Sequence, residues 1–287
     1  MMQLRRLSVS VLLVFIGVIA VVALAPSAEQ DNAPEGPPAK TLRDTMWLWL
    51  NPPADPDDDY IGIPNVMIAA PPAASTVERI EPVADRGRVV CEITPSDGFD
   101  FTASLAAVQN LARQFPSIEG VVVDDMSSVL VKSAGMEAKV LSSLCRALQA
   151  RPRPLSLLGV VYTMNIDPDS PHYVPNIADY MRFLNVIVLA EWHGANLPQL
   201  EESLTRCDEL SGGKPVILCL YLHDFGGGRP MPLDLMELQC ETARRWLHEG
   251  RINGIVFSPS FVRNNRQDAE AVEWIRRWIQ RVGDEPL

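Results

Sequence analysis

The stretch Thr102–Asp125, TASLAAVQNLARQFPSIEGVVVDD, contains one complete unit of the predicted fold. Its first half places apolar side chains at helical spacing along one face: Leu105, Val108, Ala112 and Phe115. The VVV run that follows is continuous and β-branched. Such a run is typical of a parallel strand that helices cover on both faces. The stretch therefore predicts an amphipathic helix leading into a buried parallel strand.

The same alternation of helical and strand patterns runs along most of the chain. Eight strands are predicted at Met46–Leu50, Val66–Ala70, Arg88–Ile93, Gly120–Asp125, Leu155–Tyr162, Asn185–Glu191, Pro215–Leu222 and Asn253–Ser258. Helices are predicted at Thr102–Phe115, Met136–Ala150, Leu197–Leu210, Leu233–Glu249 and Gln267–Val282. Eight strand–helix repeats predict an α/β fold of the (β/α)8 TIM-like barrel type. An open doubly wound sheet is the alternative, although the GxGxxG signature of its dinucleotide-binding version is missing.

The first β/α units are expected to be irregular. The connection after the first strand, residues 51–60, reads NPPADPDDDY and is too rich in proline for a full helix. Pro82 should weaken the second helix for the same reason.

The N-terminal residues predict export from the cytoplasm. Residues 1–28 combine Arg5 and Arg6 with an apolar run, Leu7–Ala25, and are interpreted as a signal peptide or an N-terminal membrane anchor. Residues 29–43 form a Pro/Ala-rich linker, and residues 44–287 form the barrel domain. We expect a periplasmic or extracellular protein, or one anchored to the outer side of the cytoplasmic membrane. Membrane contact is expected only through the N-terminal segment, if it is not cleaved.

Charge and cysteine content narrow the classes of partner. The formal net charge is -11, and no basic cluster offsets it, so nucleic-acid binding is not expected. None of the five cysteines forms a CxxC pair. Each cysteine lies in an apolar pattern, which is typical of small buried side chains. The sequence still allows one disulfide bond between two of them. No cofactor or metal is predicted.

Acidic and aromatic residues gather where the predicted strands end. In a (β/α)8 barrel, this C-terminal end of the strands is the face that carries the active site. The predicted catalytic residues are Asp124, Asp125, Glu191 and Asp224. The predicted substrate-binding residues are Glu92, Trp47, Trp49, Tyr162, Trp192, His193, Tyr221 and His223. Trp246, Trp274 and Trp278 lie on helices at core-facing spacing and are predicted to pack.

Paired carboxyl groups of this kind can hydrolyse a glycosidic bond. One protonates the leaving oxygen and the other acts as nucleophile or as base toward water. Asp124 or Asp125 is predicted as the acid, and Asp224 or Glu191 as the nucleophile or base. Because neighbouring residues on a strand point to opposite faces, at most one of Asp124 and Asp125 is expected to face the mouth of the barrel. A carbohydrate is the expected ligand.

Three segments resemble strand ends of glycosidase-like (β/α)8 proteins of the exported bacterial type. They are Ser117–Met126, ending GVVVDDM, then VILCLYLHDFG at residues 216–226 and INGIVFSPS at residues 252–260. In large glycosidase groups the acid follows the fourth strand and the nucleophile the seventh, which implies Asp124 or Asp125, and Asp224. The DxxDxDxE run of chitinase-like barrels does not occur.

Other readings of the same residues stay open. The protein could bind glycans without hydrolysing them, through the aromatic residues of the mouth. His193 and His223 beside Glu191 and Asp224 could hold a catalytic metal, although the first strand lacks the HxH of metal-dependent amidohydrolase barrels. The glycines at 226–228 could bind phosphate, and the acidic loop Asp55–Asp59 could bind calcium.

Overall fold

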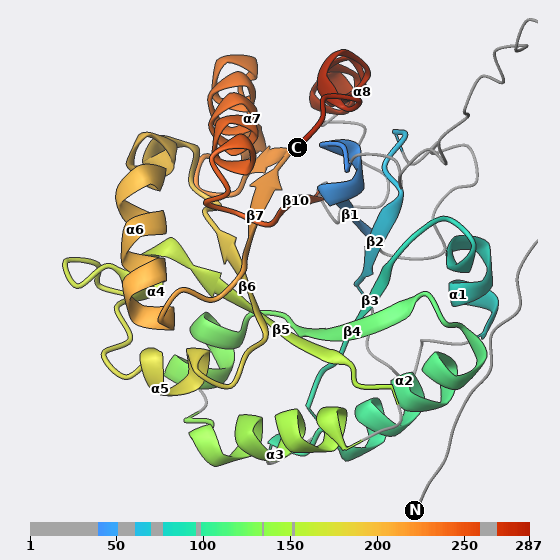
Figure 1. Cartoon of the computed structure of the whole chain (residues 1–287). Helices are drawn as coiled ribbons and strands as arrows, with labels where there is room; N and C mark the ends of the chain where they lie inside the picture. Colours follow the sequence, from blue (N-terminus) through green and yellow to red (C-terminus); the bar gives the residue numbers. More distant parts are fainter. Residues whose placement is uncertain are drawn as a thin grey trace, which may run out of the picture. The chain divides into compact units, whose positions relative to one another are not determined.

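Parallel strands close into an eight-stranded barrel in the computed structural model (Figure 1). The structure describes residues 40–50, 61–69, 77–95, 99–133, 135–150, 153–258 and 269–287. The strand order is β1-β10-β7-β6-β5-β4-β3-β2, and closure follows because β1 pairs with both β2 and β10. The predicted (β/α)8 barrel is confirmed, and the open sheet is wrong.

The barrel strands coincide with the predicted apolar runs to within three residues at each end. They are β1 (Met46–Leu50), β2 (Asn65–Ile68), β3 (Val89–Glu92), β4 (Ile118–Val123), β5 (Ser156–Tyr162), β6 (Val186–Ala190), β7 (Val216–Tyr221) and β10 (Gly254–Ser258). Nearly every residue in them is buried, because the barrel interior covers one face and the helices cover the other. Glu92 is one of the few strand residues that keep some exposure.

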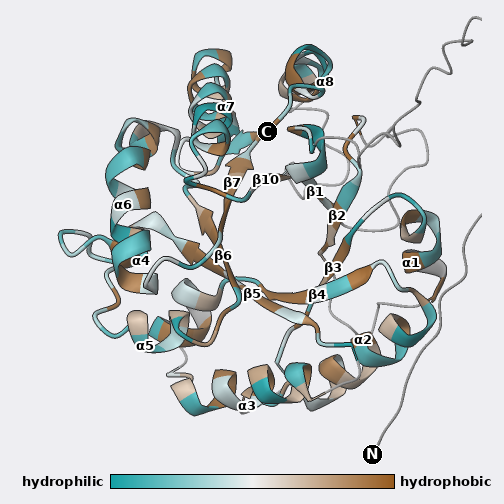
Figure 2. Cartoon of the chain, viewed as in Figure 1, coloured by the Kyte–Doolittle hydropathy of each residue, from teal (hydrophilic) through white to brown (hydrophobic). Residues whose placement is uncertain are grey.

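The helices lie outside the ring of strands and turn their apolar faces toward it (Figures 1 and 2). They are α1 (Val77–Ala84), α2 (Thr102–Gln114), α3 (Ala138–Gln149), α4 (Thr163–Ile166), α5 (Ala178–Met181), α6 (Leu200–Ser211), α7 (Leu233–His248) and α8 (Ala269–Val282). Short 3-10 turns, η1 (Arg43–Thr45) and η5 (Gly194–Gln199), precede β1 and α6. Trp246 and Trp278 are fully buried and Trp274 packs against the core, as predicted.

The sequence predicts irregular structure in the first β/α units, and the structure shows it also after β4, β5 and β7. Helix α1 does form, with Pro82 inside it. After β4 the chain makes a π-helix, η4 (Met126–Ser133), and after β5 it makes only the two four-residue helices α4 and α5. After β7 the short strands β8 (His223–Asp224) and β9 (Arg229–Pro230) pair as a hairpin.

The π-helix is fixed by polar contacts that join it to the next strand. Ser127 and Ser128 both donate hydrogen bonds to Oδ1 of Asn165, at 2.7 and 2.9 Å. Ser127 also accepts a hydrogen bond of 3.0 Å from the backbone N–H of Tyr162. These contacts tie the π-helix to the end of β5 and to α4, and π-helical turns are frequent at functional sites.

Several predictions fall on residues that the structure does not describe. They concern the N-terminal segments 1–28 and 29–39, the acidic loop Asp55–Asp59, and the last two residues of the segment 252–260 that resembles glycosidase-like barrels. Within the described residues, no helix is long and apolar enough to cross a membrane. All five cysteines are described and free.

Candidate active site

Three carboxyl groups converge at the ends of two neighbouring strands. Glu92 is the last residue of β3, and Asp124 and Asp125 directly follow β4. Glu92 pairs with Val122 across the two strands, so the aspartates lie only two and three residues beyond the level of Glu92. The negative charges of both aspartates act on Glu92. We call these three residues the carboxyl cluster.

A sharp turn at Asp125 brings both aspartates to the same place. Asp125 has φ +47°, which is the left-handed region that only a few per cent of non-glycine residues adopt. Its backbone N–H donates a 2.8 Å hydrogen bond to Oδ1 of Asp124. The expected alternation therefore ends with β4, and both carboxyl groups act on Tyr162 and Glu92. Because Asp124 and Asp125 both follow the last residue of β4, the strand alternation that predicts only one of them at the mouth does not extend to this pair.

Burial and the charges of neighbouring carboxyl groups raise the pKa values of Glu92 and Asp124. Burial, with the charges of Asp124 and Asp125 added, raises the pKa of Glu92 to about 8. Burial and the charge of Asp125 raise the pKa of Asp124 to about 6, although the N–H of Asp125 opposes this rise. At neutral pH, Glu92 thus carries a proton while Asp124 is mostly ionised. One partly exposed site thus holds a proton donor and a proton acceptor.

Two tyrosines join the cluster. Tyr162, the last residue of β5, donates a 2.7 Å hydrogen bond from its hydroxyl to Oδ1 of Asp125. The side chain of Tyr221, the last residue of β7, hydrogen-bonds to Tyr162. Burial and nearby carboxylates raise the pKa of both hydroxyls above the ordinary value of 10, so both keep their protons. Tyr162 therefore acts as a donor that orients Asp125.

Aromatic rings form a wall beside the cluster. The ring of Trp192 lies 5.3 Å from that of Tyr162 and 6.3 Å from that of Phe225. Phe225 also meets the edges of Tyr221 and His223, at 5.3 and 5.0 Å. Phe225 is 38% exposed, so this wall presents an apolar face to solvent. Sequence reasoning missed Phe225, although its place directly after the predicted Asp224 could have indicated it.

Asp224 holds two loops together. Its Oδ1 accepts hydrogen bonds from the backbone N–H groups of Gly194 (3.0 Å) and Gly227 (2.9 Å), and its Oδ2 lies 3.5 Å from Nε of Arg229. Burial would raise the pKa of Asp224, but these donors and the Arg229 charge hold it below the ordinary value. The predicted nucleophile is thus an ionised clamp between the loops after β6 and β7.

The glycines after Asp224 form a tight turn against this clamp. A Cβ at Gly226 would lie 2.6 Å from the ring of His193, and one at Gly227 would lie 2.4 Å from Oδ2 of Asp224. The backbone N–H of Phe225 donates a 3.0 Å hydrogen bond to the carbonyl of Trp192. The glycine run therefore allows the two loops to pack closely, which explains it without a phosphate.

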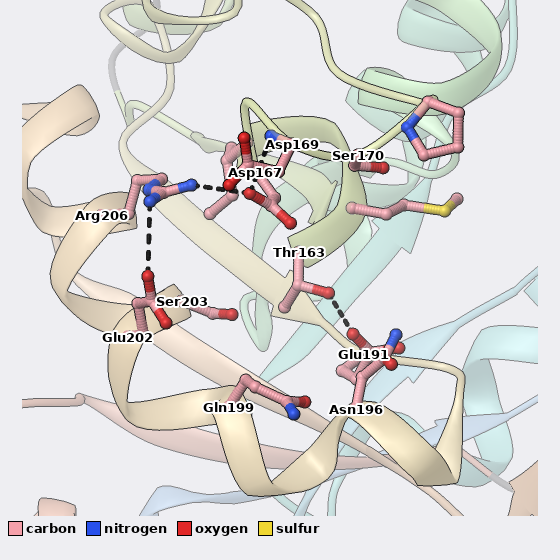
Figure 3. Close-up of a pocket in the computed structure, with 13 residues that line it drawn as sticks. Thr163, Asp167, Asp169, Ser170, Glu191, Asn196, Gln199, Glu202, Ser203 and Arg206 are labelled. Atoms are coloured by element: carbon pink, nitrogen blue, oxygen red, sulfur yellow. Dashed lines mark hydrogen bonds and ion pairs between the residues drawn. The ribbon is translucent and has the colours of Figure 1, made fainter.

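Glu191 lies away from the carboxyl cluster. It is 5% exposed and accepts hydrogen bonds from the hydroxyl of Thr163 and from the backbone N–H of His193. Glu191 and Thr163 line a polar pocket of about 400 Å³ (Figure 3). Neither Glu191 nor Asp224 is among the charges that shift Glu92 or Asp124.

The two tryptophans of β1, Trp47 and Trp49, lie at different heights along the barrel axis. The guanidinium of Arg88, which precedes β3, lies 4.5 Å from the ring centre of Trp47. A Cβ at Gly254, the first residue of β10, would lie 3.4 Å from Nε1 of Trp47. Trp47 is therefore at the N-terminal end of the barrel, opposite to the mouth predicted for it. Trp49 lies two residues nearer the mouth and is 3% exposed.

Metal-ligating side chains do not gather in the described part of the chain. There, no group of three His, Cys, Asp or Glu side chains could hold a metal ion. His193 packs on Gly226 and His223 lies against Phe225.

Comparison with known proteins gives the type of barrel. No known protein family and no curated protein matches the chain. A GH18 chitinase from Pseudoalteromonas aurantia is 16% identical, with a TM-score of 0.55 over 82% of this chain and 99% of that chain. The C-terminal domain of ChiA from Legionella pneumophila is 13% identical, with a TM-score of 0.51 over 83% and 98%. A GH128 endo-beta-1,3-glucanase mutant from Amycolatopsis mediterranei, in complex with laminaripentaose, is 14% identical, with a TM-score of 0.50 over 75% and 88%.

These similarities concern the fold. The chain has the (β/α)8 barrel found in these glycoside hydrolases, so the predicted resemblance to glycosidase-like barrels is confirmed at that level.

Proposed function

We propose that the protein is a glycoside hydrolase that acts on a polysaccharide or oligosaccharide, with the carboxyl cluster as its catalytic groups. The observation that carries this proposal is the convergence of Glu92, whose pKa is raised, with Asp124 and Asp125 at the neighbouring ends of β3 and β4. Glycosidases need two carboxyl groups in opposite protonation states. The barrel's similarity to glycoside hydrolases, one of them with a bound oligosaccharide, supports the proposal.

Each member of the cluster then has a role. Glu92 donates its proton to the glycosidic oxygen as the bond from that oxygen to the anomeric carbon breaks. Asp125, held by the hydroxyl of Tyr162, either attacks the anomeric carbon or takes a proton from an attacking water. Asp124 adds negative charge that keeps Glu92 protonated. The rings of Trp192 and Phe225 offer apolar faces to the sugar.

Conservative substitutions test these roles. Glu92→Gln and Asp125→Asn should each lower kcat by a factor of about 10²–10⁴ on chitin and β-1,3-glucan oligosaccharides, with the far-UV circular dichroism unchanged. Glu119→Gln is the matched control, because Glu119 is a half-exposed carboxylate of the same strand β4 that pairs with Arg88. If both variants hydrolyse the substrates as fast as the unmodified protein, the proposal fails. Tight oligosaccharide binding without any hydrolysis would favour the non-catalytic glycan-binding alternative.

We also propose that the protein works outside the cytoplasm. The basic start and the apolar run Leu7–Ala25 support this. Mass spectrometry of the protein recovered from each cell fraction tests it. Recovery of the chain, cut after Ala25 or intact, only from the cytoplasm would contradict it.

A further inference from the structure

A recess lies at the same end of the barrel as the carboxyl cluster, where β5 and β6 end. Its floor is formed by Thr163 and Glu191, which directly adjoin Tyr162 and Trp192 in the chain (Figure 3). Tyr162 and Trp192 stack on each other in the wall, whereas Thr163 and Glu191 line the pocket. The carboxyl cluster and this cavity of about 400 Å³ therefore share one end of the barrel: Tyr162 bonds to Asp125, and the next residue, Thr163, lines the cavity.

The pocket contains side chains that are already held in place. Arg206 of α6 makes ion pairs with Asp167 (2.9 Å) and Glu202 (3.5 Å), so its guanidinium is fixed at one side (Figure 3). Glu191 is fixed on the floor by the hydroxyl of Thr163 and by a backbone N–H. A pocket with groups positioned before binding loses little entropy when a ligand arrives.

Two further side chains have their hydrogen-bonding groups unused. Asn196 and Gln199 lie three residues apart on the 3-10 turn η5, a spacing at which side chains project in the same direction. Neither side-chain amide bonds to another residue in the described part of the chain. Each amide offers two N–H donors and a carbonyl acceptor to the pocket.

We propose that this pocket is a second sugar-binding site, which holds a residue of the same glycan that occupies the mouth. Paired hydroxyl groups of a sugar both donate and accept, which matches the unused amides of Asn196 and Gln199 and the carboxylate of Glu191. The volume lies within the range of pockets that hold small ligands. This inference rests on the proposed function, since it assumes that a glycan occupies the mouth.

The double variant Asn196→Ala with Gln199→Ala tests the site, because both residues are exposed and their loss leaves the core intact. Against chitin and β-1,3-glucan oligosaccharides of increasing length, its KM should rise about tenfold for the long oligomers only, with kcat unchanged. Calorimetric binding to the same double variant in the Glu92→Gln background should weaken by the same factor. Glu209→Ala, on an exposed part of α6 outside the pocket lining, is the control.

The outcomes separate this inference from the proposed function. Weaker binding of long oligomers by the double variant, with no hydrolysis by the unmodified protein, would support the pocket and refute the glycosidase. Hydrolysis with an unchanged KM for every oligomer would overturn the pocket and keep the glycosidase. An equal loss for short and long oligomers would also overturn it, since short oligomers do not reach beyond the mouth. If no oligosaccharide binds, both proposals fall.

Discussion

Replacing Asp224 distinguishes a catalytic carboxylate from a structural one. Hydrogen bonds to a charged acceptor contribute about 1.5–3 kcal/mol each, and neutral ones about 0.5–1.5 kcal/mol. Asp224→Ala removes the acceptor of the Gly194 and Gly227 N–H groups and should lower the free energy of unfolding by about 3–6 kcal/mol. Asp224→Asn keeps a neutral acceptor and should cost about 2 kcal/mol. The ion pair with the exposed Arg229 adds at most about 1 kcal/mol.

The pH dependence has a definite sign. Because the folded pKa of Asp224 lies below the ordinary value of 3.8, its charge stabilises the fold above about pH 4. That contribution is lost as the pH falls through the lowered pKa. The difference between the unmodified protein and Asp224→Asn should therefore shrink below pH 4.

Chemical denaturation followed by circular dichroism, together with turnover of an oligosaccharide, measures both effects. We expect Asp224→Asn to keep most of its kcat while it loses stability. If Asp224→Asn instead loses all turnover with an unchanged free energy of unfolding, Asp224 is catalytic, as the resemblance implied, and the clamp is refuted.

Three further substitutions test other features. Because the folded pKa of Glu92 is about 8 and its ordinary value is 4.5, the unmodified protein should lose stability between these pH values. Glu92→Gln should lose less, since only the raised pKa of Asp124, about 6, still acts there; denaturation at pH 5 and pH 9 measures the difference. Tyr162→Phe removes the donor to Asp125 and should lower kcat about tenfold to a hundredfold with little change in KM, and equal kcat would exclude the orienting role. A Cβ at Gly254 would lie 2.7 Å from the carbonyl of Thr45, so Gly254→Ala should cost about 1–3 kcal/mol, visible as a lower melting temperature.

Sequence reasoning located the barrel because its strands are covered on both faces. A run such as VVV in β4 has no polar face, so the amino-acid sequence alone predicts both that it forms a strand and that it is buried. The same reasoning brought Glu92, Asp124 and Tyr162 to one place, since the carboxyl ends of parallel strands meet at one end of a barrel. Those three are indeed coupled.

The remaining features depend on contacts between distant segments. The π-helix after β4 rests on Asn165, which lies 38 residues beyond Ser127. The role of Asp224 depends on Gly194, 30 residues earlier, whose N–H it accepts. No local pattern predicts such partners. The sequence assigns Trp47 to the first strand but does not give its height along the barrel axis. The prediction that Trp47 lies at the mouth failed for this reason.

The left-handed backbone at Asp125 has a consequence for evolution and engineering. Glycine adopts this conformation freely, whereas an aspartate held there costs the fold a free energy of order 1 kcal/mol. Asp125→Gly would relieve this strain, but it would also remove the acceptor of the Tyr162 hydroxyl, a hydrogen bond that contributes about 0.5–3 kcal/mol. The contact with Tyr162 thus gives an aspartate a place in a turn whose backbone would otherwise favour glycine.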